Sequence, residues 1–211
     1  AAKGVYITRV DVGDVMLPQR LQLQRQVLEQ YPRCHFVSSN VGFFGPQWEF
    51  LWLTPGKPET SRPVQVLSEK PGNGLDADIP HHGSVMFRKS AYIQVGGYRR
   101  EFYYGQDWDL WYRLAEIGEY FVIPEVLYKA RLFPDAISMS HAKKQEAIAR
   151  CSLGGHIARM KGKSEQYLLD EAKNIRPAME ASKNGRKTNG YYFIGEALRR
   201  NKDATCRKYL I

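Results

Sequence analysis

The first third of the chain alternates between strand-like and helix-like hydrophobic patterns. Residues 4–10 contain the β-prone run Val-Tyr-Ile and predict a strand. Pro18 favours the start of a helix, in which Leu21, Val27 and Leu28 form an apolar stripe. Further strands are predicted at residues 34–44, 48–54 and 64–67.

The middle of the chain carries denser apolar segments. They predict a short strand at 83–87, one or two helical turns closed by glycine, and a helix at 106–117. Two more strands are predicted on either side of Pro124, at residues 120–123 and 126–131. Strands with intervening helices are typical of an α/β sandwich, and this is the fold class that the pattern predicts.

The composition changes after Ser140. Segments rich in Ala, Lys and Arg predict helices at residues 141–161, 164–182, 188–200 and 202–211. We interpret 1–140 as the functional core and 141–211 as a helical C-terminal extension. The whole net charge of +9 lies in this extension. Such a basic segment either contacts an anionic membrane, nucleic acid or a phosphorylated substrate, or forms solvated helix faces, and both readings stay open.

Length and cysteine content narrow the class of protein. A chain of 211 residues with 43% apolar content predicts one soluble domain with an appendage. It has no apolar run long enough for a membrane span or a secretory signal. Its three cysteines are far apart and outside any CxxC spacing, which indicates reduced thiols in a cytoplasmic protein and argues against a disulfide framework or zinc site.

Two carboxylates, Asp11 and Asp14, follow directly after the first predicted strand. Oxygen ligands in this position can bind a hard cation such as magnesium or manganese, which then bridges to substrate phosphates. Aspartate is also common in turns, so a purely structural role in the turn before the helix is the simpler interpretation of this pair alone.

The stretch QDWDLWYRL, residues 106–114, places Asp107 and Asp109 in the first turn of a predicted helix. The helix dipole favours anions there, and a carboxylate beside an aromatic wall can act as a general base. Capping of the helix by Asp107 explains the same position. Trp108 and Trp111 fit either the core or a sugar-stacking surface.

The stretch PHHGSVMFRKS, residues 80–90, combines two histidines with Arg88 and Lys89. Adjacent histidines lack the i, i+4 spacing of a helical zinc site. They bind another metal or a phosphate, or they are ordinary polar loop residues. Arg88 and Lys89 can meet a phosphate, although simple exposure is the default interpretation.

Taken together, these stretches resemble family 2 glycosyltransferases of the GT-A fold, and their order carries the resemblance. The matching segments are YITRVDVGD (6–14), PQRL (18–21), HGSVMFR (82–88), GGY (96–98) and QDWDLWYRL (106–114). The resemblance extends over residues 3–140. It implies an incomplete GT-A domain, with a Rossmann-like mixed sheet and flanking helices. It also implies an inverting enzyme that uses a nucleotide-sugar donor.

The resemblance implies donor-side roles for the first stretch. Asp11 would contact the nucleotide part of the donor. The DXD-like motif, or DXD-like segment, which is DVGD (11–14) here, would hold a divalent metal, Mn or Mg. The aspartate that usually binds the metal is Gly13 here, so the metal ligands would be Asp14 and Asp11. This substitution leaves open a weak metal site or none.

The resemblance implies acceptor-side roles for the later stretches. Asp107 would be the catalytic base that takes the proton from the acceptor hydroxyl. His82, Arg88, Trp108 and Asp109 would surround the acceptor or phosphate pocket, and Asp109 would organise it.

Members of this family begin with a nucleotide-binding half, whereas the DXD-like motif starts here at residue 11. The resemblance therefore implies a truncated or split enzyme, or a descendant without the donor half. A second copy, the helical extension or a complementary chain would cover the exposed sheet edge. The expected partners are a nucleotide-sugar donor and a saccharide or lipid-linked acceptor, at a cytoplasmic location that includes the inner membrane face.

Two alternatives remain beside the enzyme. The first is a non-catalytic glycosyltransferase-like binding or assembly module. It is favoured by Gly13, and by Gln106 at the position where the resemblance implies a glutamate before the base. The second is a binder of anionic membrane or nucleic acid that works through residues 141–211.

Overall fold

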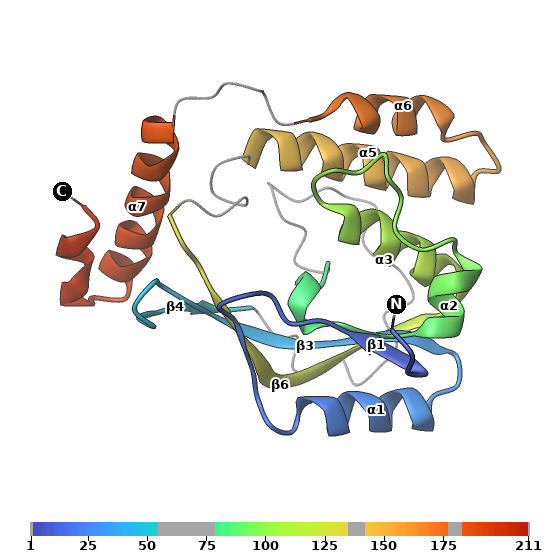
Figure 1. The fold of residues 1–211 in the computed structure, drawn as a ribbon, viewed down its shortest axis with the longest axis horizontal. Coiled ribbons are helices and arrows are strands. Elements are labelled where there is room, and N and C mark those ends of the chain that lie inside the picture. The colour runs from blue at the N-terminus through green and yellow to red at the C-terminus, as the bar shows by residue number, and fades with distance from the viewer. Residues whose placement is uncertain (1, 55–78, 135–141, 177–182, 211) are drawn as a thin grey trace.

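The computed structural model describes residues 2–54, 79–134, 142–176 and 183–210 (Figure 1). These residues form one sheet with helices on both of its faces. The strands are β1 (Tyr6–Thr8), β2 (Val15–Met16), β3 (Cys34–Phe44), β4 (Phe50–Leu53), β5 (Met86–Arg88) and β6 (Glu119–Arg131).

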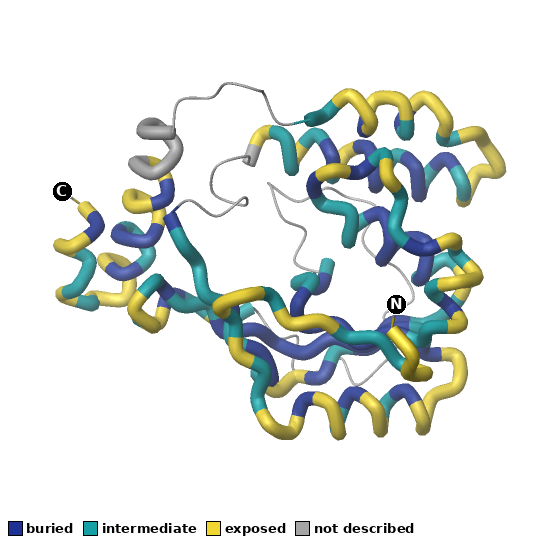
Figure 2. Tube along the Cα trace, viewed as in Figure 1, coloured by how far each residue is buried: buried dark blue, intermediate teal, exposed yellow. Residues whose placement is uncertain are grey.

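The sheet is mixed and has the order β1-β5-β3-β6-β2, with β4 paired to β3 beyond this path. The long strands β3 and β6 run parallel through its centre, and every other pairing is antiparallel. Figure 2 shows β3 buried over most of its length, as expected for a strand covered on both faces. The mixed α/β class predicted from the sequence is confirmed.

Helices from different parts of the chain cover the two faces. Helix α1 (Arg20–Gln30) packs on one face, and α2 (Lys89–Gln94) and α3 (Gln106–Ile117) lie on the other. Adjacent β3 residues reach opposite cores: Phe36 packs with Trp111 of α3, and Val37 packs with Leu28 of α1. The ring of Phe36 stacks between Trp111 and Tyr120, at centroid distances of 5.5 and 4.5 Å.

The C-terminal helices form two groups. Helix α5 (Ala142–Met160) packs against α3, and α6 (Gln166–Asn174) lies against α5. Helix α7 (Lys183–Arg200) and the 3₁₀ helix η2 (Ala204–Lys208) lie beside β4 at the other end of the sheet. Ile194 and Leu198 of α7 form a buried cluster there with Leu51 and Tyr209. Within the described part of the chain, no helix is both long and apolar enough to cross a membrane.

Several predicted elements are confirmed, and the predicted break of a strand at Pro124 is wrong. The strand at 34–44 and the helix at 106–117 have the predicted bounds. The predicted strands at 120–123 and 126–131 are instead the single strand β6. Pro124 and Glu125 form an exposed bulge, because Ile123 pairs with Ser39 and Val126 already pairs with the next residue of β3. The bulge tolerates the missing N–H of proline without ending the strand.

Other boundaries differ from prediction in local detail. The predicted strand at 83–87 is the 3₁₀ helix η1 (His82–Ser84) followed by β5. The predicted helix at 202–211 is the short η2, and the helix starting near 164 ends at Asn174. The strand predicted at 64–67 lies outside the described residues.

Candidate active site

Polar side chains from four segments meet on the α3 face of the sheet. Arg9 and Asp11 follow β1, His82 opens η1, Tyr98 lies in the loop after α2, and Asp107 lies in the first turn of α3. Figure 1 shows η1 between α3 and α7 above the sheet. We refer to these five residues as the polar cluster.

Arg9 holds the polar cluster together. Its Nη1 lies 3.0 Å from Nδ1 and 3.2 Å from Nε2 of His82, and its Nη2 forms an ion pair with Asp11. The side chains of Arg9 and Asp11 are 44% and 36% exposed, so both are accessible to a ligand. The guanidinium thus places one fixed positive charge between the DXD-like segment and η1.

His82 is a neutral member of the cluster. Burial, and then the nearby charge of Arg9, lower the pKa of His82 to about 3. A guanidinium N–H can only donate, so His82 accepts from Arg9. Nε2 of His82 also lies within hydrogen-bonding distance of the Tyr98 hydroxyl, at 2.7 Å. Burial keeps the pKa of Tyr98 above its usual value, so its hydroxyl stays protonated.

Asp107 is the largely buried carboxylate of the cluster. Its side chain is 15% exposed, and Oδ2 lies 3.9 Å from Nδ1 of His82. Burial raises the pKa of Asp107 to about 6, although backbone N–H groups and Arg9 act in the opposite direction. A carboxylate with a pKa near the working pH suits general-base chemistry. The structure therefore brings together Asp11, His82 and Asp107, three residues that the sequence singled out.

Asp14 anchors the turn that carries Asp11. Its Oδ1 accepts from the backbone N–H of Arg131 at 2.8 Å, and its Oδ2 accepts from the hydroxyl of Tyr128 at 2.7 Å. That hydroxyl in turn accepts from the backbone N–H of Asp11 at 3.1 Å. These contacts tie the turn to β6 and give Asp14 a structural role.

Gly13 has a backbone conformation that favours glycine. Its φ is +93°, and a Cβ atom there would lie 3.3 Å from a ring carbon of Phe133. An aspartate at this position would be strained. No group of three or more His, Cys, Asp or Glu side chains suited to a metal occurs among the described residues.

Arg20 stabilises the backbone next to the polar cluster, although the sequence alone assigned it no role. It is fully buried, and its guanidinium donates to the carbonyls of Arg9 at 3.3 Å and Val85 at 3.1 Å. It also packs over the ring of Tyr128. Its place in the PQRL stretch (18–21) was the available signal.

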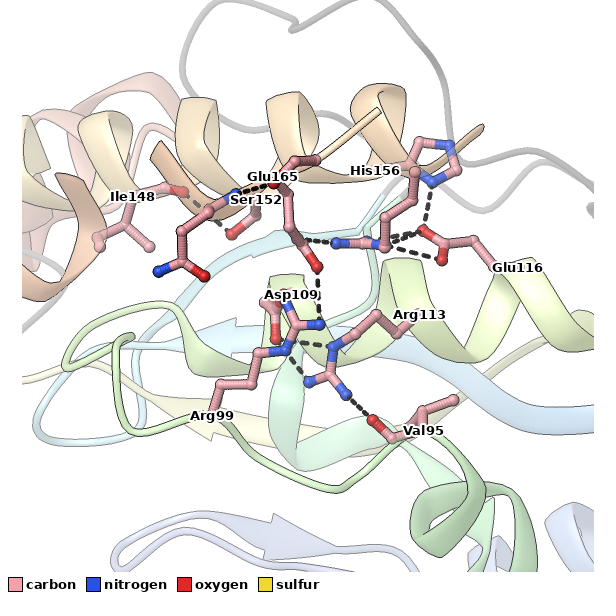
Figure 3. A network of polar contacts seen from close by, with 12 residues as sticks. Val95, Arg99, Asp109, Arg113, Glu116, Ile148, Ser152, His156 and Glu165 are labelled. Carbon is pink, nitrogen blue, oxygen red and sulfur yellow. Dashed lines mark hydrogen bonds and ion pairs between the residues drawn. The ribbon is translucent and has the colours of Figure 1, made fainter. Parts of the chain in front are cut away.

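Asp109 belongs to a separate buried network, shown in Figure 3. Its Oδ2 accepts from Nε of Arg113 at 3.0 Å, and its Oδ1 accepts from Arg99 at 3.3 Å. Arg113 also donates to the carbonyls of Val95 at 2.6 Å and Gly97 at 2.8 Å. The network thereby fixes the loop that presents Tyr98 to the polar cluster.

The same network continues into the C-terminal helices (Figure 3). Nη2 of Arg99 donates to Glu165 at 2.9 Å, and Glu165 pairs with Arg159 of α5. Arg159 pairs with Glu116 of α3 at 2.7 Å, and His156 contacts the same carboxylate at 2.8 Å. Helix α3, which carries Asp107, is thus held by charged contacts as well as by its apolar face.

Two predicted pocket residues lie outside these contacts. Arg88 donates to the carbonyls of Leu28, Tyr31 and Cys34, which joins the end of α1 to the sheet. The structure does not bring Arg88 to the polar cluster. Trp108 is half-buried in the first turn of α3, next to Asp107.

Curated sequence relatives match about two thirds of the chain. The chain is 34% identical over 140 residues, 64% of its length, to EpsE of Bacillus subtilis (strain 168), which is named as a glycosyltransferase. It is 26% identical over 133 residues, 63% of its length, to the amylovoran biosynthesis glycosyltransferase AmsE of Erwinia amylovora. The chain is similar in sequence to glycosyltransferases.

The extent of this similarity is limited. The chain spans about half the length of the curated relatives it matches, 46% of EpsE and 47% of AmsE. No family model matches it. The crystal structure of S. aureus TarS 1-349 aligns with 99% of this chain and 64% of TarS, at 10% identity and a TM-score of 0.45.

Proposed function

We propose that this chain is the acceptor-side part of an inverting, GT-A-type family 2 glycosyltransferase. In this proposal it transfers a sugar from a nucleoside-diphosphate sugar to an acceptor hydroxyl. The observation that carries the proposal is Asp107, a largely buried carboxylate with a pKa of about 6 that lies 3.9 Å from His82 in the polar cluster. The similarity to named glycosyltransferases supports sugar transfer in general.

Asp107 acts as the general base. Its carboxylate takes the proton from the acceptor hydroxyl while the hydroxyl oxygen forms a bond to the anomeric carbon. The bond from that carbon to the diphosphate breaks, and the leaving diphosphate keeps the electron pair. His82 is neutral and cannot protonate the base, and Tyr98 holds the imidazole in place. Arg9 places positive charge where the diphosphate leaves.

Asp11 acts on the donor side. Its half-exposed carboxylate binds the nucleotide part of the donor and is the one acid of the DXD-like segment that we assign to a divalent cation. Magnesium sites often use one or two carboxylates together with substrate phosphates, so Asp11 alone fits such a site. When bound, Mn or Mg would offset the charge of the diphosphate. Asp14 is assigned to the turn.

Release of nucleoside diphosphate tests this proposal. UDP-, GDP- and dTDP-sugars are incubated with the chain, Mn²⁺ and a panel of methyl glycosides as acceptors, and the released diphosphate is measured. We expect saturable release from one donor class and a loss of about 100-fold or more in Asp107→Asn. Asp170→Asn, an exposed aspartate on α6, is the matched control and keeps full activity. Absence of release from every donor, or equal release by Asp107→Asn, would contradict the proposal.

A non-catalytic binding module is the second candidate function, favoured by the glycine conformation at position 13. It predicts saturable UDP-sugar binding without turnover. Contact of residues 141–211 with an anionic membrane is a further proposal based on their charge. Binding to anionic vesicles that weakens with salt would support it.

A further inference from the structure

A cavity of about 350 Å³ lies at the end of the sheet away from α2. Its walls come from the β3–β4 turn, the segment after β6, and the α7–η2 pair. The residues that define its chemistry are Gln47, Phe133, Pro134, Tyr191, Lys208 and Tyr209. A volume of this size is at the lower end of the range of about 300–1,000 Å³ for small-molecule sites.

The walls of the cavity are held by specific contacts. Helix α7 approaches the segment after β6 so closely that a Cβ atom at Gly190 would lie 2.1 Å from the carbonyl oxygen of Pro134. The hydroxyl of Tyr209 donates to Glu49 of the β3–β4 turn at 2.6 Å. These contacts fix the three wall segments relative to one another, so the cavity is preformed.

Arg131 stiffens the wall on the sheet side. Its guanidinium packs 5.1 Å from the ring centroid of Trp48 and 5.0 Å from that of Phe133, and it donates to the carbonyl of Pro46. Two aromatic rings and a backbone carbonyl therefore hold one rigid side chain behind the cavity.

The lining combines aromatic faces with hydrogen-bonding groups. Tyr209 is 7% exposed and forms the floor, whereas Tyr191 is 43% exposed and forms the rim, with ring centroids 6.1 Å apart. Lys208 Nζ donates to Oε1 of Gln47 at 3.3 Å, so the two polar groups of the lining lie together. A pyranose ring has an apolar C–H face and a hydroxyl edge, and this combination matches both halves of the lining.

The cavity is joined to the turn that carries Asp11. Phe133 lines the cavity and also packs against Gly13. Two residues earlier, the backbone N–H of Arg131 binds Asp14 at 2.8 Å. One short segment after β6 therefore contacts both the cavity and the DXD-like segment.

We infer that this cavity is a saccharide subsite that binds the acceptor through stacking on Tyr191 and hydrogen bonds from Lys208 and Gln47. The acceptor assignment rests on the proposed transferase function, whereas saccharide binding itself does not. The cavity then supplies acceptor affinity and selectivity from helices that follow the catalytic segment.

Saturation-transfer NMR with simple sugars tests the inference. The 211-residue chain is titrated with the methyl glycosides of glucose, galactose, N-acetylglucosamine and rhamnose. We expect saturation of the ring C–H protons of at least one glycoside. We also expect Tyr191→Ala to weaken its binding about tenfold, which corresponds to about 1.4 kcal/mol. Tyr191→Phe should preserve most of the binding, because it keeps the aromatic face that stacks on the sugar.

Tyr192→Ala is the matched control, because Tyr192 is 64% exposed on the same helix and does not line the cavity. It should bind the glycoside as the unmodified chain does. Equal loss in both variants, or no binding of any glycoside, would overturn the inference. Competition by UDP for a site that requires Tyr191 would assign the cavity to the nucleotide and would also overturn it.

Glycoside binding and diphosphate release, measured on the same protein sample, distinguish failure of this inference from failure of the proposed function. Diphosphate release without Tyr191-dependent glycoside binding leaves the transferase proposal standing and rejects the subsite. Glycoside binding without release from any nucleotide sugar keeps the saccharide site and rejects transfer.

Discussion

Arg9 Nη1 lies 3.0 Å from Nδ1 of His82, although 73 residues separate them in the chain. The contact joins the end of β1 to η1, and the ion pair of Arg9 with Asp11 extends it to the DXD-like segment. Arg9 also lowers the pKa of both His82 and Asp107. One cation therefore acts on the protonation of both the proposed base and its neighbour, beside the larger effect of burial.

Replacing Arg9 should shift the pH dependence of activity. In Arg9→Gln the pKa of Asp107 rises further above 6, because a charge that favours the carboxylate is lost. The acid limb of the kcat/KM profile, measured by diphosphate release, should move to higher pH. The pKa of His82, followed by NMR, should also rise but stay below 6.5, because burial remains the main cause of its shift.

Arg9→Lys keeps the charge and should show a smaller shift, and Arg25→Gln is the control on an exposed part of α1. An acid limb that stays in place in Arg9→Gln would show that Arg9 does not act on the base.

Asp107 should be a destabilising residue above pH 6. Its pKa is raised in the folded protein from 3.8 to about 6, so the folded state loses stability as pH rises through this interval. Asp107→Asn removes the buried charge and should increase the free energy of unfolding at pH 8 by on the order of 1–3 kcal/mol. Urea denaturation should show the gain fading below about pH 4, where the carboxyl is neutral in both states.

The same variant should lose catalysis, so stability and activity would change in opposite directions. Asp170→Asn, on the surface of α6, should change neither quantity by a measurable amount. Lower stability of Asp107→Asn at pH 8 would contradict the burial argument.

The sequence predicts what depends on short-range pattern. The apolar run of β3 and the glycine-bounded helix α3 have the predicted bounds, because each is fixed by local periodicity. His82 and Asp107 could be selected from motifs, and the structure brings their side chains within 3.9 Å. The roles of Arg9 and Tyr98 were not predictable, because their contacts join segments far apart in sequence.

Helix α1 illustrates where apolar patterns mislead. The predicted stripe includes Leu21, which is 41% exposed, whereas fully buried Arg20 and Gln24 lie on the inner face. Their polar groups are satisfied by carbonyls of the residue after β1, of β3 and of the η1–β5 segment. A hydrophobicity pattern cannot predict a buried polar face whose partners come from other elements.

The Asp109–Arg113 pair should be important for stability. Both side chains are almost completely buried, at 1% and 4% exposure, and removing one partner leaves a buried charge. We expect Asp109→Asn to lower the free energy of unfolding by about 3–5 kcal/mol, measured by urea denaturation. Glu146→Gln removes an exposed i, i+4 pair with Arg150 and should cost less than about 0.5 kcal/mol. Similar costs for the two variants would contradict the structural role of this pair.

Asp11 and Asp14 should differ in their response to metal. Mn²⁺ binding in the presence of UDP, measured by water-proton relaxation, should weaken about tenfold or more in Asp11→Asn. Asp14→Asn should bind Mn²⁺ as before but lose about 1–3 kcal/mol of stability, because Tyr128 and the backbone of Arg131 lose a charged acceptor. Equal losses of Mn²⁺ affinity in the two variants would show that Asp14 is a metal ligand as well.

Restoring an aspartate at position 13 should not create a stronger metal site. The φ of +93° costs a non-glycine residue about 1–2 kcal/mol, and the new Cβ would press on the ring of Phe133. Gly13→Asp should therefore unfold at lower urea concentration without gaining Mn²⁺ affinity.

Gly162→Ala separates the two costs, because Gly162 also has a positive φ of +64° but has no atom within 4 Å of its Cβ position. A larger loss of unfolding free energy in Gly13→Ala than in Gly162→Ala would measure the cost of the Phe133 contact. A stable Gly13→Asp variant that binds Mn²⁺ more tightly would contradict the prediction.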